Sequence, residues 1–275
     1  MIAALRRLLL LSAAAIALSA SGLAQVSADL AKAISQADAA YARADYAEAV
    51  RSYRLAADQG DAKAQFNLGN MYNAAQGVPE NHAEAVRWYR LAADQGNADA
   101  QSNLGFMYAD GRGVSQNDAE AVHWYRLAAD QGNATAQSNL GSIYATGQGV
   151  SQNDAEAVRW WHLAADQGYA GAQFNLGLAY TKGQGVSQND AEAVRWWHLA
   201  ADQGNATAQN NLGFMYYHGK GVPESFVEAY RWWSLAAAQG DSDAVKNRDF
   251  VRGKMTPTQI VEGERGADKL GQIRP

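Results

Sequence analysis

The chain has no cysteine and no run of Lys or Arg, and each absence removes a class of protein. Without cysteine, disulfide bonds are excluded, and so is lipid attachment to a signal-peptide cysteine. The net charge is −5, and the clustered basic residues that bind nucleic acid are missing. We therefore expect a protein without disulfides that does not bind nucleic acid.

Recognisable catalytic and metal-binding motifs are also missing. The chain contains no Ser-x-x-Lys, no His-Glu-x-x-His and no phosphate loop, and its Gly-x-Gly pairs lack the third glycine of a dinucleotide fingerprint. Of the five histidines, only His162 and His198 occupy the same place in a sequence repeat described below. We predict no cofactor and no metal site, and we read the histidines as solvated surface residues.

Residues 1–24 have the layout of a secretory signal peptide. Arg6 and Arg7 precede an apolar run that ends at Leu18, is too short to span a bilayer and is followed by small residues. We predict cleavage after Ala24, with the site after Ala28 as second choice. An uncleaved amphipathic or membrane helix is the alternative. The mature protein is expected to be periplasmic or secreted, without stable membrane insertion.

The main feature of the sequence is a repeat of 36 residues. The stretch "LAADQG" begins at positions 55, 91, 127, 163 and 199, and a near copy, "LAAAQG", begins at 235. Stacked repeats of this length form one elongated domain. The predicted division is an N-terminal helix pair similar to a plain tetratricopeptide unit at 29–60, five repeats at 61–96, 97–132, 133–168, 169–204 and 205–240, and capping helices at 241–275.

Each repeat predicts two antiparallel helices. In residues 97–132, Gly111 ends a first helix, Asn117 and Glu120 stand at the spacing of a capping box for a second, and Gly132 ends it. Such a pair cannot bury both of its faces alone, so the pairs must stack. The apolar residues on one face of the first helix are Ala100, Leu104, Met107 and Tyr108.

We therefore predict an all-α fold, a right-handed α/α solenoid superhelix of stacked antiparallel helix pairs. One loop departs from the pattern, because Ala75 stands where the other repeats have Gly, and we expect that loop to be set differently. Thr256 and Pro257 predict the capped start of a final helix that runs to about Leu270.

The pattern A-x-x-x-L-G-x-x-Y-x-x-G-x-G-V, followed by A-x-x-W-Y/W-x-x-A-A-x-Q-G, resembles the Sel-one-like repeat, a relative of the tetratricopeptide repeat. The resemblance covers residues 61–240. It implies an interaction scaffold and not an enzyme, although some disulfide-rich relatives are reported to bind penicillin or hydrolyse β-lactams. Those relatives carry regularly spaced cysteine pairs, which this chain lacks. A hydrolase of β-lactams or cell-wall peptide is the alternative function.

An asparagine stands directly before the Leu-Gly pair of each first helix. Alignment with the tetratricopeptide pattern places it on the concave side, and the resemblance implies that a ladder of such residues clamps the backbone of an extended peptide. An amide suits this task because it offers a donor and an acceptor. The alternative is that these amides bond within or between repeats. The five residues are Asn67, Asn103, Asn139, Asn175 and Asn211.

The positions that flank the asparagines combine aromatic and small polar side chains without charge. This composition favours a groove for an uncharged or apolar extended segment. All eight tryptophans fall on second helices, where we expect them in the core between repeats, with a contribution to a binding surface as the alternative. The predicted specificity residues are Phe66, Phe106, Phe174 and Phe214. The sequence leaves the partner and the oligomeric state open.

Overall fold

The computed structural model describes residue 25 and residues 27–272, and every regular element in this part of the chain is a helix. The predicted signal peptide lies outside the described residues. Residues 27–42 are helical. The following helices are α2 Tyr46–Asp58, α3 Ala62–Asn73, α4 His82–Asp94, α5 Ala98–Asp110, α6 Asp118–Asp130, α7 Ala134–Thr146, α8 Asp154–Asp166, α9 Ala170–Lys182, α10 Asp190–Asp202, α11 Ala206–His218, α12 Phe226–Ala238, α13 Ser242–Arg252 and α14 Pro257–Gln272.

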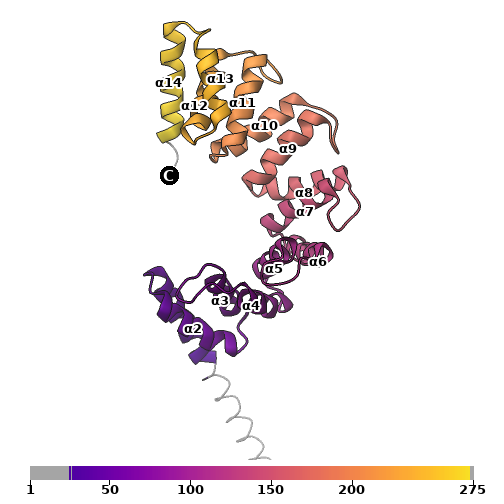
Figure 1. Ribbon diagram of the computed structural model, residues 1–275, viewed down its shortest axis with the longest axis vertical. Helices are drawn as coiled ribbons and strands as arrows, with labels where there is room; N and C mark the ends of the chain where they lie inside the picture. Colours follow the sequence, from indigo (N-terminus) through magenta and orange to yellow (C-terminus); the bar gives the residue numbers. More distant parts are fainter. Residues whose placement is uncertain (1–24, 26, 273–275) are drawn as a thin grey trace, which may run out of the picture. The chain divides into compact units, whose positions relative to one another are not determined.

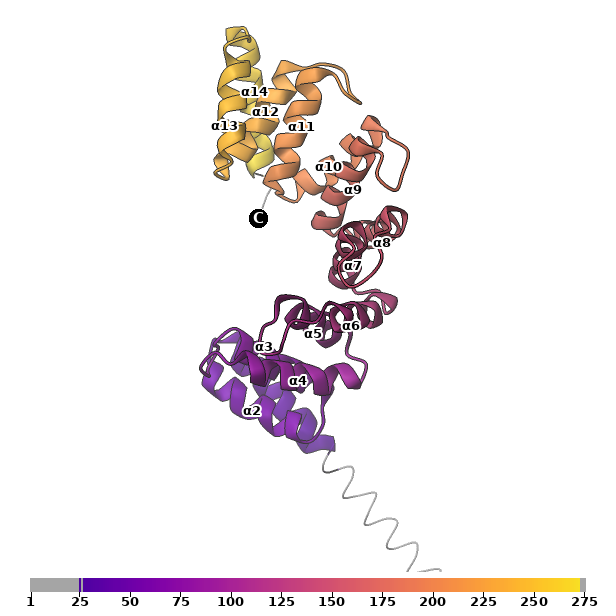
Figure 2. The same cartoon turned by 45° about the vertical axis from the view of Figure 1, so that its right-hand side comes forward.

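The chain divides into two compact units, unit 1 with residues 1–117 and unit 2 with residues 118–275. In unit 1 each helix from α2 to α5 packs against the next (Figure 1). In unit 2 the same holds from α6 to α13, and α14 packs on α12 beside the chain's C-terminal end (Figure 2). The predicted all-α fold of packed helix pairs is confirmed.

The repeated "LAADQG" forms the last turn of each second helix, as expected. In α4, Ala92 and Ala93 are buried, and Gln95 is the C-cap, with its backbone N–H donating to the carbonyl groups of both alanines. Gly96 follows with φ of +87°. Its left-handed conformation turns the chain into the next first helix, which explains why glycine stands at this place in every copy.

The second helices begin at the predicted caps, but the capping box is not closed. The Asn81 side chain accepts from the backbone N–H of Glu84, as predicted. The backbone N–H of Asn81, however, donates to the carbonyl of Tyr72 at 3.0 Å. Because that donor is already used, the Glu84 carboxylate pairs with Arg87 instead, at 3.2 Å. The same ion pair recurs at Glu156–Arg159, Glu192–Arg195 and Glu228–Arg231.

The loop that contains Ala75 differs from the others by one residue. α3 ends at Asn73, one position earlier in the repeat than α5, whose C-cap is Gly111 with φ of +68°. Ala75 occupies the place of Gly111 and still adopts φ of +54°. The left-handed turn is therefore kept although its residue carries a Cβ atom, which is unfavourable in this conformation.

Ala75→Gly is expected to raise the free energy of unfolding of the protein by about 1 kcal/mol, because glycine removes the left-handed strain and loses part of that gain to its larger entropy when unfolded. Urea denaturation followed by circular dichroism measures the change. Ala74→Gly is the control, since Ala74 has φ of −104° and nothing to relieve. An unchanged or lower midpoint for Ala75→Gly contradicts the assignment of strain.

Candidate functional site

The five predicted asparagines lie on the first helices α3, α5, α7, α9 and α11, one on each, and all are half-buried. In every case the next residue is a leucine with no exposed surface, for example Leu176 after Asn175. The leucine side chain packs in the core, and the half-buried asparagine beside it therefore lies at the edge of the buried face of the helix.

A buried glutamine two residues before each asparagine fixes the rotation of the first helix. In α9, Gln173 donates from Nε2 to the carbonyl of Ala165 on the preceding helix, at 3.3 Å, and its Oε1 accepts from Nε2 of Gln203 at 2.8 Å. Gln203 is the C-cap of α10. The sequence analysis missed this bridge, although the strictly repeated Ala-Gln and Gln-Gly pairs carry its signal. Equivalent bridges involve Gln65, Gln137 and Gln209.

The glycine after four of these leucines, on α3, α7, α9 and α11, lets an aromatic side chain of the second helix lie against the first. A Cβ atom on Gly69 would lie 2.7 Å from the Tyr89 ring, and one on Gly213 would lie 2.5 Å from Nε1 of Trp233. Gly177 and Trp197 form the same contact. Small residues thus allow the two helices of a pair to approach, as the sequence predicted.

The tryptophans are mainly core residues. Seven of the eight are buried, and only Trp161 is half-buried. Several buried rings also stack under the ion-paired arginines, with Arg159 lying 4.1 Å from the centroid of Trp160. The predicted placement of tryptophan in the core is confirmed for these seven.

In unit 1 the predicted asparagines have internal hydrogen-bond partners. Tyr89 donates to Oδ1 of Asn70 at 2.8 Å, and Nδ2 of Asn103 donates to the same oxygen at 3.1 Å. Burial raises the pKa of Tyr89 to about 12, against the opposing effect of its hydrogen bond with Asn103. Asn67 is likewise bonded to Tyr53, whose pKa is raised, mainly by burial and by its bond to Asp38. These two amides stabilise contacts between helices.

On α8 and α10 of unit 2 the situation changes, because tryptophan stands in the place of tyrosine. The indole N–H of Trp161 donates to the carbonyl of Ser138 at 3.2 Å, and that of Trp197 donates to the carbonyl of Phe174 at 3.1 Å. Neither ring therefore donates to the asparagine that follows it on the next first helix. Within the described residues, no side-chain hydrogen bond is formed by Asn175 or Asn211.

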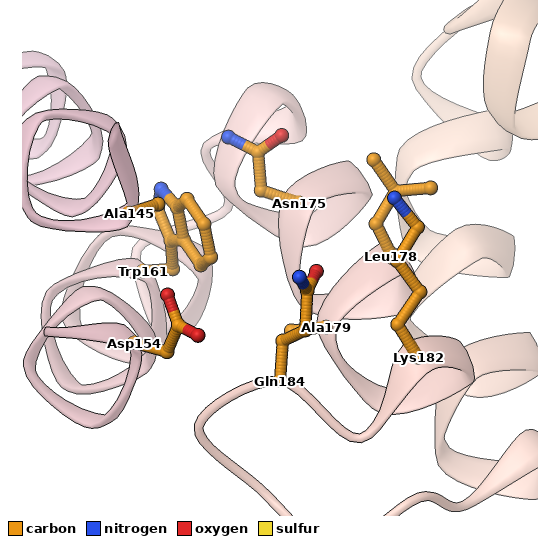
Figure 3. Close-up of a pocket in the computed structure, with 8 residues that line it drawn as sticks. All are labelled: Ala145, Asp154, Trp161, Asn175, Leu178, Ala179, Lys182 and Gln184. Atoms are coloured by element: carbon orange, nitrogen blue, oxygen red, sulfur yellow. The ribbon is translucent and has the colours of Figure 1, made fainter. Parts of the chain in front are cut away.

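A pocket of about 120 Å³ opens beside one of these free amides. Figure 3 shows the amide of Asn175, on α9, and the indole of Trp161, on α8, facing the same space. Asp154 stands on the side of Trp161, and Lys182 stands on the side of α9. The pocket thus combines an aromatic wall, an amide and charges of both signs.

The same place in the repeat is hollow in unit 1 as well. A second pocket, of about 190 Å³, is lined by Tyr41, Tyr53, Asn67 and Asn70. Tyr53 and Asn67 stand three repeats before Trp161 and Asn175. A hollow between the second-helix aromatic and the next asparagine is therefore a recurring feature of the fold, and in unit 1 its amide is occupied by tyrosine.

The four predicted specificity residues fall into two groups. Phe106 and Phe214 are 44% and 45% exposed, so their rings are available to a ligand. Phe66 and Phe174 are half-buried, with the Phe66 ring 6.1 Å from that of Tyr89 and Phe174 packed on the core of the last repeats. The second group has mainly a packing role in the structure.

One asparagine of the row was missed by the sequence analysis. Asn247 on α13 stands 36 residues after Asn211, and its Nδ2 lies 3.4 Å from Oδ1 of Asn210. α13 lacks the Leu-Gly pair that defined the pattern, because Arg248 and Asp249 stand there. The spacing alone, carried past the last repeat, would have found it.

His162 and His198 are packed between repeats and are not free on the surface. The His198 ring lies 5.2 Å from that of Trp232, edge to face, and its Nε2 lies 3.1 Å from the hydroxyl of Tyr216. Burial lowers the pKa of both histidines, while Asp166 and Asp202 oppose the shift. The described residues contain no group of three or more His, Cys, Asp or Glu placed to hold a metal ion.

The repeat pattern is recognised by comparison with known families. The sequence model of the Sel1 repeat matches residues 37–61, 62–97, 98–133, 134–169, 170–205 and 206–241. The chain belongs to the Sel1 repeat family. The first match, 37–61, covers most of the segment 29–60, for which the sequence predicted a shorter, tetratricopeptide-like pair. No curated protein matches this Sel1 repeat chain.

Two solved structures are similar to it at the level of sequence and fold. The first is c5321, a protective antigen present in uropathogenic Escherichia coli strains that displays an SLR fold, with 36% identity over 82% of this chain and a TM-score of 0.77. This chain spans only 48% of that protein's length. The second is a Sel1 repeat protein from Oxalobacter formigenes, with 35% identity, coverage of 76% of this chain and 86% of the other, and a TM-score of 0.70.

Gly177→Ala is expected to lower the free energy of unfolding by about 1–3 kcal/mol, because the new methyl group would overlap the Trp197 indole. Urea denaturation measures the loss. Gly171→Ala on the same helix is the control, since its methyl group would lie 3.0 Å from the movable Tyr169 ring and at ordinary contact distance, 3.9 Å, from Oγ of Ser138. Equal stability of the two variants would show that α9 and α10 are not held by this contact.

Proposed function

We propose that the protein is an exported, non-catalytic scaffold that binds a partner protein through an extended peptide segment laid along the first helices of unit 2. One observation carries the proposal. The amides of Asn175 and Asn211 are half-buried and lack hydrogen-bond partners within the described residues. Their polar atoms are not among the buried unbonded ones, so these amides at repeat-equivalent positions are accessible to a ligand that offers a donor and an acceptor.

A peptide backbone is the ligand that matches a row of primary amides. Each amide offers two donor hydrogens and an acceptor oxygen, and each peptide bond offers one of each. Packed helices lie roughly 8–10 Å apart and an extended chain advances about 3.3 Å per residue, so one asparagine would meet about every third residue of the peptide.

The pocket between Trp161 and Asn175 supports the same proposal. Its volume of about 120 Å³ is of the order of one apolar side chain, and a peptide bonded to Asn175 would carry its side chains directly past this opening. The exposed Phe214 ring offers a second apolar contact on α11. In this proposal Asn67 and Asn103 serve mainly the structure of unit 1, because tyrosines already bind them.

Family membership agrees with a scaffold. Sel1 repeats are typically used as platforms for protein–protein interaction, and the family is generally non-catalytic. Nothing in the structure or the comparisons supports the alternative of a β-lactam or cell-wall hydrolase. None of the described helices is both long and apolar enough to cross a membrane.

The triple variant Asn139→Ala, Asn175→Ala, Asn211→Ala tests the peptide site. Peptides selected from a random library on residues 25–275 are expected to bind the triple variant on the order of 100-fold more weakly, since three net hydrogen bonds of about 1 kcal/mol each are lost. Fluorescence anisotropy measures the affinity, and thermal unfolding by circular dichroism shows whether the fold is intact.

A matched control replaces three exposed loop amides at another repeat-equivalent position, Gln116→Ala, Gln152→Ala and Gln188→Ala. This variant is expected to bind the selected peptides like the parent protein. Unchanged binding by the asparagine variant would place the site elsewhere. A large loss of stability in that variant would instead support a structural role for the row, against the proposal.

Export has its own test, since the proposed compartment follows from residues 1–24. Expression of the full chain in a bacterium with a periplasm is expected to yield protein outside the cytoplasm whose N-terminus is Gln25, or Asp29 if cleavage follows Ala28. Mass spectrometry of the purified protein measures the N-terminus. Cytoplasmic protein that retains Met1 and its leader would contradict export.

A further inference from the structure

A cluster of aromatic rings and lysines covers the ends of α11 and α13. The Tyr217 ring lies 6.0 Å from that of Phe250 and 4.8 Å from that of His218, which in turn lies 4.2 Å from Phe214. Lys254 lies 5.0 Å from the centroid of Tyr217 and 4.5 Å from that of Phe250, and Lys220 lies 5.6 Å from that of Phe214. We name these six residues the aromatic–lysine patch.

The patch is open to solvent. Phe214 and Phe250 are 45% and 57% exposed, and both lysines are exposed. Large exposed apolar side chains gathered in one place commonly mark an interaction site. The phenyl rings therefore offer an apolar contact, and the ammonium groups stand directly beside it.

The positive charge of the patch is not neutralised by the protein. Within the described part of the chain, neither Lys220 nor Lys254 forms an ion pair, although Lys254 donates to the hydroxyl of Tyr217. The carboxylate nearest in sequence to Phe250, that of Asp249, is bound by Arg248 at 2.7 Å. The patch therefore presents two available cations on a protein whose overall charge is negative.

At the equivalent position of the repeat in unit 1, the cation beside the phenylalanine is paired with an acid. There Arg112 lies 5.8 Å from the centroid of Phe106, which corresponds to Lys220 beside Phe214 three repeats later. Arg112 is paired with Asp110 at 3.0 Å, whereas His218 stands in the position of that aspartate in the patch. Because an imidazole stands in the place of the aspartate, Lys220 has no ion-pair partner within the described residues.

The patch adjoins the asparagine row. Phe214 and Phe250 follow Asn211 and Asn247 by three residues, so each ring neighbours its asparagine on the surface of one helix. Lys182, two repeats before Lys254, also lines the pocket that contains Asn175. Lysines thus lie near the asparagine row from α9 onward. The residues that directly flank the asparagines in the sequence carry no charge and gave no sign of this positive charge. Asp154 lines that pocket too, so the charge is least balanced at the patch.

We propose that the aromatic–lysine patch makes unit 2 selective for an extended segment in which acidic residues alternate with aromatic or apolar ones. This inference rests on the proposed function, because it names the chemistry of the peptide that the asparagine row binds. The sequence composition alone had favoured an uncharged segment. A carboxylate of the peptide meets Lys220 or Lys254, and the adjacent side chain lies on Phe214 or Phe250.

Two synthetic peptides test this selectivity, one that repeats Phe-Glu-Ala and one that repeats Phe-Gln-Ala, a period that follows the spacing of the helices. The glutamate peptide is expected to bind about tenfold more tightly at low ionic strength, as two partly exposed ion pairs would give. Added salt is expected to shrink the difference, because such pairs are screened. Fluorescence anisotropy measures both affinities.

The double variant Lys220→Gln, Lys254→Gln is expected to bind both peptides with the affinity that the parent protein shows for the glutamine peptide. Lys246→Gln is the control for the loss of a lysine outside the patch, since Lys246 lies on α13 and is already paired with Asp243 at 2.9 Å. This control is expected to keep the full preference for glutamate.

The outcomes separate the inference from the proposed function. Equal binding of the two peptides to the parent protein, or a preference that survives in the double variant, overturns the role of the patch and leaves the asparagine row in place. Binding of neither peptide by the parent protein overturns both proposals for this peptide class. A preference that is lost only in the double variant supports the patch.

Discussion

Four first helices, α3, α7, α9 and α11, each depend on one buried glutamine that bonds to two neighbouring helices at once. Its Nε2 donates to an alanine carbonyl on the preceding second helix, and its Oε1 accepts from the glutamine that ends the following one. An unbonded amide at this depth would be strongly destabilising, so the rotation of the helix is fixed by the need to satisfy it. Residues two apart differ by about 200° around a helix, which turns the asparagine away from the glutamine.

The difference between the open amides of Asn175 and Asn211 and the bonded ones of unit 1 follows from the reach of an aromatic side chain. A tyrosine hydroxyl extends past the first helix and bonds to asparagine amides, as Tyr89 does with Asn70. An indole N–H points from the side of its ring and bonds to a backbone carbonyl instead, as Trp197 does with Phe174. A change from Tyr to Trp thus releases an amide without removing the aromatic contact with glycine.

Much of the fold could be predicted from the sequence because its signals are local. Helix caps, glycine stops and apolar faces depend on residues within one helix, and they placed Asn175 on its first helix correctly. The glutamine bridge, in contrast, joins residues 30 apart, such as Gln173 and Gln203. The closed capping box was wrongly predicted because a carbonyl outside the helix, that of Tyr72, competes for the donor of Asn81.

The candidate site was less predictable for the same reason. Its asparagine row was visible as a repeat, but the state of each amide depends on the aromatic residue of another helix. Asn247 escaped because the pattern was defined by Leu-Gly, which α13 does not need as the last helix of the row. The lysines of the patch follow the asparagines by seven to nine residues in the sequence. Their place beside the row depends on the three-dimensional positions of the helix ends, which the sequence pattern does not give.

The glutamine bridge spans 30 residues, and the bond between Lys254 and Tyr217 spans 37, so the stabilising contacts described here rarely reach beyond the adjacent repeat. A low contact order of this kind favours fast folding that starts at any helix pair and spreads to its neighbours. It also means that an in-frame gain or loss of one 36-residue segment meets complementary surfaces on both sides. The length of the asparagine row can therefore change by unequal recombination, without a compensating change elsewhere in the chain.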